Sequence, residues 1–341
     1  MPGLLLDTLN GKRGSRVPLW LMRQAGRYLP EYRALRAEKG GFLAMAYDSE
    51  AACEITLQPI ERFAFDGAIL FSDILIVPHA LGQHLEFLAG EGPKLSPPLV
   101  DAALESLEPD PSRYEPIYQT VRLCRNRLGQ STTMLGFAGS PWTVATYMVA
   151  GEGSRDQHEA RAMAYRDPAA LQGIVDAISD QTIEYLRGQI DAGAEAVQLF
   201  DSWSGSLAPD EFERWVIAPN AAIVAALGES HPDTPVIGFP KGAGEKLPAY
   251  ARETGVKAIG VDETLDPAWV ARELPAGMAV QGNLDPLLLL AGSDALEARI
   301  RAILDAFADR PHVFNLGHGI DRRTPIEHVE RLIAAVRGFE G

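Results

Sequence analysis

The feature that most constrains the fold of this chain is a unit that recurs along it. Each unit has a short apolar run, a turn rich in glycine or polar residues, and then a helical stretch. The apolar runs are Val17–Leu21, Ala68–Phe71, Thr133–Phe137, Ala196–Phe200, Pro235–Phe239, Ala258–Val261, Ala279–Gln281 and Val313–Leu316. Because these runs are continuously apolar, they are typical of strands buried on both faces of a parallel sheet.

The stretches between the runs carry helical patterns. Residues 167–192 open on Asp167 and Pro168, a cap and first-turn pair, and close on Gly193. Their apolar stripe comprises Leu171, Ile174, Val175, Ile178, Tyr185, Leu186 and Ile190. Asp48–Phe63 is a second helix, which we expect Pro59 to end or kink. Residues 292–309 and 324–338 complete the last two units.

Eight strands, each followed by a helix or helical turn, predict an α/β fold, a single (β/α)8 TIM-type barrel spanning residues 1–341. A doubly wound open sheet is the main alternative, because periodicity alone does not separate the two. Residues 79–100 place several glycines and prolines around Gln83–Leu88. We interpret this stretch as a hairpin insertion after the second strand.

Composition narrows the class of protein. No stretch approaches ~18 consecutive apolar residues and the first residues lack a signal-peptide pattern, so we expect a cytoplasmic protein without a membrane span. Cys53 and Cys124 fall in apolar helical stretches and are expected to be buried thiols. The histidines show no ligand spacing, so no metal is expected. A net charge of −15 argues against nucleic-acid binding.

Residues 1–36 reverse the sign of that charge, with seven basic side chains against two acidic ones. Within them, Arg23 and Arg27 lie four residues apart with Gly26 between them. Two planar guanidinium groups at this spacing suit one partner rich in carboxylate or phosphate. The alternative is an ordinary solvated basic turn.

In a barrel the chemistry belongs at the carboxyl ends of the strands. The polar residues that follow the runs there include Arg23, Arg27, Asp73, Tyr147, Ser202, Lys241, Asp262, Asn283, Asn315 and His318. Each has a plainer interpretation: Asp73 or Ser202 as caps, and Tyr147 as a packed aromatic. His318 stands between two glycines, which keep a side chain accessible. Lys241 lacks the spacing of a phosphate-binding loop.

With these residues identified, the sequence resembles the uroporphyrinogen decarboxylase family over nearly its whole length. Pro18–Arg33 resembles the family's first signature, and the stretch from Gly136 (GFAGSPWTVATYMV) resembles its second. The motifs Phe71-Ser-Asp-Ile-Leu, Gln281-Gly-Asn-Leu-Asp-Pro and Asn315-Leu-Gly-His-Gly fit as well.

The resemblance implies a homodimeric barrel without metal or organic cofactor that converts uroporphyrinogen III to coproporphyrinogen III in heme biosynthesis. It implies that Asp73 holds the pyrrole N–H groups and that the arginines bind substrate carboxylates. The implied catalytic residues are Asp73, Arg27, Tyr147 and His318. The implied substrate-binding residues are Arg23, Gln24, Ala25, Gly26, Arg27, Asp73, Tyr147, Ser202 and His318.

These residue types suit that chemistry. Loss of CO2 from an acetate leaves an electron pair, which a pyrrole protonated at a ring carbon can accept. That ring is cationic, so a fixed anion such as Asp73 stabilises it while accepting several N–H bonds. At an effective dielectric constant near 20, such a pair at 4 Å is worth about 4 kcal/mol, less than the ~8–23 kcal/mol an enzyme typically supplies. Positioning, exclusion of water and proton delivery must therefore contribute the rest.

Three other functions fit parts of the sequence. A barrel methyltransferase of the corrinoid- or thiol-methylating kind needs a thiolate zinc site, whose spacing Cys53 and Cys124 lack. A Schiff-base aldolase would use Lys241. A non-catalytic tetrapyrrole carrier would use the same aspartate and arginines, and only product analysis separates it from the decarboxylase.

Overall fold

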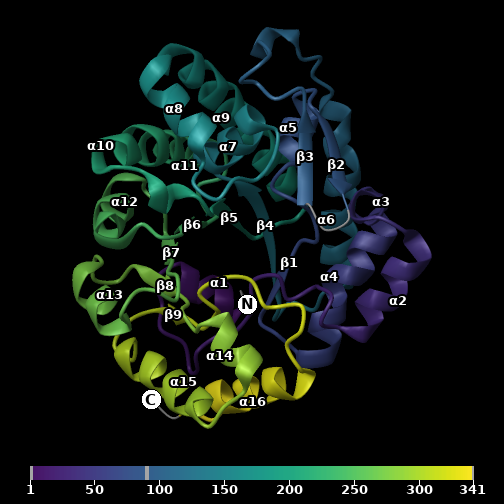
Figure 1. Cartoon of the computed structure of the whole chain (residues 1–341). Coiled ribbons are helices and arrows are strands. Elements are labelled where there is room, and N and C mark those ends of the chain that lie inside the picture. The colour runs from purple at the N-terminus through teal and green to yellow at the C-terminus, as the bar shows by residue number, and fades with distance from the viewer. Residues whose placement is uncertain (1–2, 89–91, 340–341) are drawn as a thin grey trace.

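A parallel sheet ringed by helices is the framework of the molecule (Figure 1). The computed structural model describes residues 3–88 and 92–339. The sheet has the order β1-β4-β5-β6-β7-β8-β9, and every neighbouring pair is parallel. Its strands are β1 (Gly67–Ile69), β4 (Thr133–Gly139), β5 (Ala196–Asp201), β6 (Val236–Pro240), β7 (Ala258–Gly260), β8 (Ala279–Gln281) and β9 (His312–Val313). The α/β class and the parallel sheet are therefore confirmed.

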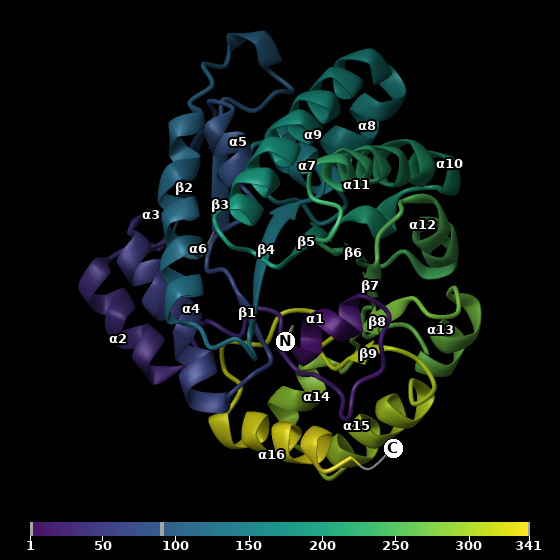
Figure 2. The ribbon, with the colours of Figure 1, turned by 180° about the vertical axis from the view of Figure 1, so that it is seen from behind.

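Helices surround this sheet in both views (Figures 1 and 2). They are α1 (Leu4–Leu9), α2 (Pro30–Lys39), α3 (Phe42–Tyr47), α4 (Ser49–Phe63), α5 (Ile76–Ala80), α6 (Glu115–Arg127), α7 (Pro141–Ala150), α8 (His158–Arg166), α9 (Pro168–Asp191), α10 (Pro209–Phe212), α11 (Ala218–Ser230), α12 (Leu247–Glu253), α13 (Pro267–Glu273), α14 (Pro286–Ala291), α15 (Ala295–Ala306) and α16 (Ile326–Arg337). Leu5 of α1 packs against Gly67 at the start of β1, so α1 lies at the amino ends of the strands.

The predicted helices are present, with one correction. The Asp167 side chain accepts a hydrogen bond from Ala170 N (3.1 Å) and caps α9, whose predicted apolar stripe is buried or partly buried. Helix α4 begins after Asp48 and ends at Phe63, which are the predicted bounds, and of the two effects expected of Pro59 an end of the helix does not occur. Because nine residues of α4 are buried, its packing outweighs the one backbone hydrogen bond that a proline removes.

The predicted first strand, Val17–Leu21, takes a different form. It makes a single parallel bridge, between Leu19 and Phe314, the residue directly after β9. Side-chain oxygens capture its backbone donors: Asp66 Oδ2 accepts from Leu19 N (2.9 Å) and Gln24 Oε1 accepts from Leu21 N (3.0 Å). A regular strand ladder cannot form where its N–H groups are bonded elsewhere.

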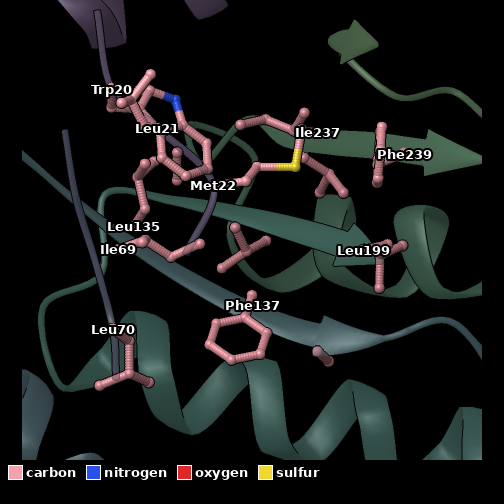
Figure 3. Close-up of a cluster of buried hydrophobic side chains, with 14 of the residues drawn as sticks. Trp20, Leu21, Met22, Ile69, Leu70, Leu135, Phe137, Leu199, Ile237 and Phe239 are labelled. Atoms are coloured by element: carbon pink, nitrogen blue, oxygen red, sulfur yellow. The ribbon is translucent and has the colours of Figure 1, made fainter. Parts of the chain in front are cut away.

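This segment nevertheless occupies the space between the two edge strands. Phe314 N donates to Pro18 O (2.9 Å) on one side, and Asp66 N donates to Leu19 O (2.9 Å) on the other. Inside the sheet, Trp20 Nε1 donates to Gln281 Oε1 (3.0 Å), and Gln281 Nε2 donates to Gln198 Oε1 (3.0 Å). Figure 3 shows side chains of the segment and of β4, β5 and β6 gathered in one buried cluster.

An antiparallel pair stands apart from the parallel sheet. Strands β2 (His84–Leu88) and β3 (Gly92–Ser96) pair with each other between β1 and β4 in the chain. They fall within the predicted hairpin of residues 79–100, of which residues 89–91 lie outside the described part. The two thiols are buried and free, in α4 and α6, as predicted.

Candidate active site

The predicted site residues follow successive strands at the end of the sheet opposite α1. Arg23–Arg27 follow the segment that ends at Leu21, Asp73 follows β1, and Ser202 directly follows β5. Tyr147 lies in α7, the helix after β4, and His318 lies in the loop after β9. Parallel strands bring these separate loops to one edge of the molecule, which is where sequence reasoning expected the chemistry.

Asp73 lies partly buried in the turn before α5. Its Oδ1 accepts a hydrogen bond from Leu75 N (2.8 Å), a local turn bond rather than a cap on α5. Burial raises the pKa of Asp73 to about 6, against the lowering effects of that hydrogen bond and of the Arg23 charge. Its Oδ2 has no hydrogen bond within the described residues, so this carboxylate has an oxygen to offer to a ligand.

Arg23 links the site residues. Its charge lowers the pKa of Asp73, of Tyr147 and of His318, so it lies near all three. Its side chain crosses Gly319 so closely that a Cβ there would lie 2.4 Å from Arg23 Cδ. Arg23 also has a left-handed backbone, with φ 60°. Such a conformation is costly for any residue other than glycine and recurs at functional loops.

Tyr147 projects from α7 toward the same place. Burial raises its pKa, the Asp73 charge raises it further, and a hydrogen bond with the Trp203 side chain lowers it. Its ring lies against Gly153, where a Cβ would meet Tyr147 Cε1 at 3.2 Å. The hydroxyl is thus a neutral group held between a carboxylate and an indole.

His318 is neutral at pH 7. Burial lowers its pKa to about 4, and the charges of Arg23 and Lys241 lower it further, whereas Asp262 opposes them. The imidazole stacks on the ring of Phe239, with 6.4 Å between centroids and 29° between planes. The flanking glycines serve close packing, because a Cβ on Gly317 would lie 2.2 Å from Glu263 N.

The other predicted residues fall into two groups. Gln24 is fully buried, and its amide is used by the backbone, accepting from Leu21 N and donating to Gly67 O (2.9 Å). It therefore holds the arginine loop against β1 rather than presenting its amide to a ligand. Ala25, Gly26 and Ser202 are partly buried. Arg27 is exposed, and its guanidinium has no partner in the part of the chain that is described.

The structure adds Lys241, which sequence reasoning noted at a strand end without assigning it to the site, and three phenylalanines that sequence reasoning missed. Lys241, directly after β6, lies near enough to His318 to lower its pKa. The rings of Phe137, Phe200 and Phe239 form a row beside His318, at centroid distances of 5.5 and 5.9 Å. Each phenylalanine lies in the second half of its strand, a position that could have marked it, whereas the contact between rings is a product of the fold.

Charge pairing distinguishes the basic side chains of residues 1–36. Arg16 makes a bidentate ion pair with Asp66 (2.6 and 2.8 Å), and Lys12 pairs with Asp7 (2.9 Å). Arg23, Arg27 and Lys241 have no carboxylate partner among residues 3–88 and 92–339. Arg23 lies near Asp73 and Lys241 lies near His318, whereas Arg27 is exposed on the same loop as Arg23. Cations near a carboxylate and an apolar row suit an aromatic ligand that carries several carboxylates.

Three further points concern the described residues: a surface recess, metal binding and membrane-spanning helices. A recess of about 470 Å³, lined by Glu31, Glu54 and Arg62 among others, includes none of the site residues. The described histidines, cysteines and acidic residues form no group of three that would hold a metal ion. Nor is any described helix both long and apolar enough to cross a membrane.

Comparison with known proteins supplies the family. The sequence model of the family described as uroporphyrinogen decarboxylase (URO-D) matches residues 3–339. A protein named uroporphyrinogen decarboxylase from Erythrobacter litoralis is 74% identical over 100% of both chains. One of the same name from Novosphingobium aromaticivorans is 71% identical over 99% of both chains.

Solved structures resemble the fold at much lower identity. A methyltransferase from Methanosarcina mazei is 18% identical over 98% of this chain and 97% of its own, with a TM-score of 0.82. A B12-independent methionine synthase from Shewanella sp. W3-18-1 is 9% identical over 96% of each chain, with a TM-score of 0.58. At such identities the likeness concerns the fold alone.

Proposed function

The chain belongs to the uroporphyrinogen decarboxylase family, and from this premise we propose how its own side chains carry out the reaction. The protein is a carboxy-lyase that converts uroporphyrinogen III to coproporphyrinogen III. Each of four acetate side chains loses CO2, and its methylene carbon gains a proton to become a methyl group. This activity excludes the methyltransferase, aldolase and carrier interpretations as descriptions of the protein.

Asp73 is the anion at the centre of the proposed mechanism. With a pKa of about 6 it is mostly ionised at neutral pH, and N–H groups of a bound macrocycle would favour the ionised form further. The pyrrole ring is protonated at a carbon and then accepts the electron pair from the breaking C–C bond. The Asp73 carboxylate lies beside the ring during this step. It stabilises the cationic intermediate and orients the substrate at the same time.

The cations and neutral groups hold the rest of the substrate. Arg23 and Arg27 bind peripheral carboxylates, and Lys241 is an added candidate for that role. Tyr147, Ser202 and neutral His318 contribute hydrogen bonds, while the row of Phe137, Phe200 and Phe239 supplies an apolar wall. The observation that carries these assignments is that the Arg23 charge lowers the pKa of Asp73, Tyr147 and His318, which come from three other loops and helices, and that the Asp73 charge raises that of Tyr147.

The parallel sheet also supports proposals about the barrel, the domain and the assembly of the protein. We propose that the segment of residues 17–21 counts as the first member of a closed (β/α)8 barrel and that β2–β3 is a hairpin insertion. Residues 1–341 then form one domain, which acts as a cytoplasmic homodimer without metal or organic cofactor. Two observations support closure: Leu19 bridges to Phe314, and Asp66 N donates to Leu19 O.

The decisive experiment is anaerobic incubation with uroporphyrinogen, followed by chromatography of the oxidised porphyrins. The native protein is expected to release four CO2 and yield the four-carboxylate product. Asp73→Asn keeps the Leu75 hydrogen bond but loses the charge, and its turnover is expected to fall about a thousandfold, since its anion contributes about 4 kcal/mol. Activity of this variant within about twofold of the native rate would remove Asp73 from the mechanism.

A further inference from the structure

A buried acid lies directly beneath the candidate site, and the proposed mechanism does not use it. Asp201, the last residue of β5, is fully buried. Its Oδ1 accepts a hydrogen bond from Thr143 Oγ1 (2.5 Å), whereas its Oδ2 is buried and has no hydrogen-bond partner among the described residues. An unsatisfied buried carboxyl oxygen costs stability, so its presence calls for a reason other than packing.

The hydrogen bonds of Asp201 lead to the site. Thr143 Oγ1, which donates to Asp201, accepts from Trp203 N (3.1 Å). The carbonyl of Trp203 accepts from Trp142 Nε1 (3.2 Å) and from Ser206 Oγ (3.0 Å). The backbone of Trp203 is thus held at both its donor and its acceptor, and Ser202 lies between the two anchored residues.

This series of contacts, which runs from Asp201 through Thr143 to Trp203, ends at Tyr147 of the proposed active site. The Trp203 side chain lies close enough to Tyr147 to lower the pKa of its hydroxyl, a pKa that also responds to Asp73 and Arg23. Thr143 and Tyr147 lie one helical turn apart on α7, so they share one face of that helix. Trp203 therefore bridges from Thr143 to Tyr147 along the outside of the helix.

We propose that Asp201 and Thr143 are positioning residues for the decarboxylation, which fix the loop of residues 202–206 and through Trp203 orient the Tyr147 hydroxyl. This inference rests on the proposed role of Tyr147 in contacting the substrate and in catalysis. Thr143 transmits the effect because a hydroxyl, unlike a methyl group, accepts one hydrogen bond while it donates another. Two groups face Asp201 from other elements. Asn220 of α11 lowers the pKa of Asp201, and Tyr250 of α12 has its own pKa raised by the Asp201 charge.

The test removes the hydroxyl without changing the shape of the side chain. Thr143→Val is expected to lower kcat about tenfold to a hundredfold, because a small misplacement of a reacting group costs that much. Its KM is expected to stay within about twofold, since the lost orientation matters in the transition state. Thr143→Ser, which restores the hydroxyl, is expected to recover most of kcat. Asp201→Ala is expected to match Thr143→Val.

Thr146→Val is the matched control. It removes another buried hydroxyl from α7, one that donates only to Thr143 O within the same helix (2.7 Å), and it should leave kcat unchanged. If Thr143→Val lowers the stability of the protein but leaves kcat unchanged, the inference is wrong. It is also wrong if Thr143→Val and Thr146→Val change kcat equally.

A double-mutant cycle separates this inference from the function on which it rests. If Asp201 and Thr143 act through Tyr147, Thr143→Val adds little to the loss already caused by Tyr147→Phe. Full additivity of the two losses contradicts the positioning role. Unchanged kcat and KM in Tyr147→Phe alone contradicts the proposed role of Tyr147 instead.

Discussion

At the scale of single residues, the site buries titratable groups in surroundings that disfavour their charged forms. Burial raises the pKa of Asp73 to about 6 and of Asp201 to about 7, and it lowers that of His318 to about 4. In each case the charged form is the one disfavoured. A fold selected for stability alone has no need of such groups, and their clustering at one end of the sheet is typical of functional sites.

The raised pKa of Asp73 predicts that the stability of the protein depends on pH. The folded pKa lies above the usual value of 3.8, so the folded state binds more protons between pH 4 and 6, and stability falls as pH rises through that window. Asp73→Asn lacks this loss. Its stability relative to the native protein should be greater at pH 8 than at pH 5.5 by about 1 kcal/mol, measured by urea unfolding. A difference that does not change with pH would contradict the raised pKa.

Arg27 predicts a salt-dependent contact with substrate. Since its guanidinium is exposed and has no partner in the described residues, Arg27→Ala is expected to weaken substrate binding roughly tenfold and to flatten its dependence on ionic strength. Arg36→Ala in α2 removes the same charge from the same basic stretch and is the control. Equal effects of the two variants would indicate general attraction rather than a carboxylate contact.

At the scale of elements, loops after different strands are held together by side-chain hydrogen bonds and by close backbone packing. Asp262, which follows β7, accepts through Oδ2 from Gly242 N (2.7 Å) after β6 and through Oδ1 from Thr264 N (2.9 Å). The loop after β9 in turn packs onto Glu263 through Gly317. These contacts fix where His318 and Lys241 stand relative to each other.

Gly317→Ala tests this packing. The new Cβ would lie 2.2 Å from Glu263 N, so one of the two loops must shift. We expect a loss of about 1–3 kcal/mol in stability, as for other overpacked sites, together with reduced turnover because His318 moves. Gly173→Ala, on an open face of α9 with no atom within 4 Å, is the control and should be neutral or stabilising. Native stability in Gly317→Ala would show that the loops yield easily.

At the scale of the whole molecule, the distribution of charge explains how an acidic protein binds a polyanion. The chain carries −15 overall, yet beyond about 8 Å at physiological salt that field is largely screened. The unpaired Arg23, Arg27 and Lys241 then dominate at contact range. Arg16 and Lys12, by contrast, are occupied by Asp66 and Asp7 and belong to the framework.

The homodimer is a prediction at the same scale. Sedimentation equilibrium of the native protein is expected to give about twice the chain mass of 36.9 kDa at micromolar concentration. A single species at the monomer mass, with full decarboxylase activity at the same concentration, would show that one chain suffices.

Several features of the fold could be predicted because they depend on local physics. The buried strands and helix α9 follow from continuous apolar runs, a capping aspartate and an apolar stripe, all of which act within a few residues. Pro59 does not end its helix, which was one of the two effects expected of it, for the same reason. Its local penalty is real, but the burial that outweighs it comes from residues distant in sequence. The segment of residues 17–21 departs from a strand because Asp66 and Gln24 capture N–H groups within it, while Asn315 captures the N–H group of the next residue, Met22.

The sequence by itself determined the α/β class, the order of the strands' polar ends and, through long specific motifs, the family and its reaction. Only the tertiary structure decided which groups meet: Lys241 with His318, Trp203 with Tyr147, Asp201 beneath its loop, and Gln24 turned inward. The physical reason is that strand and helix patterns arise from neighbours along the chain, whereas pKa values, ion pairing and hydrogen-bond partners depend on groups that only folding brings into contact.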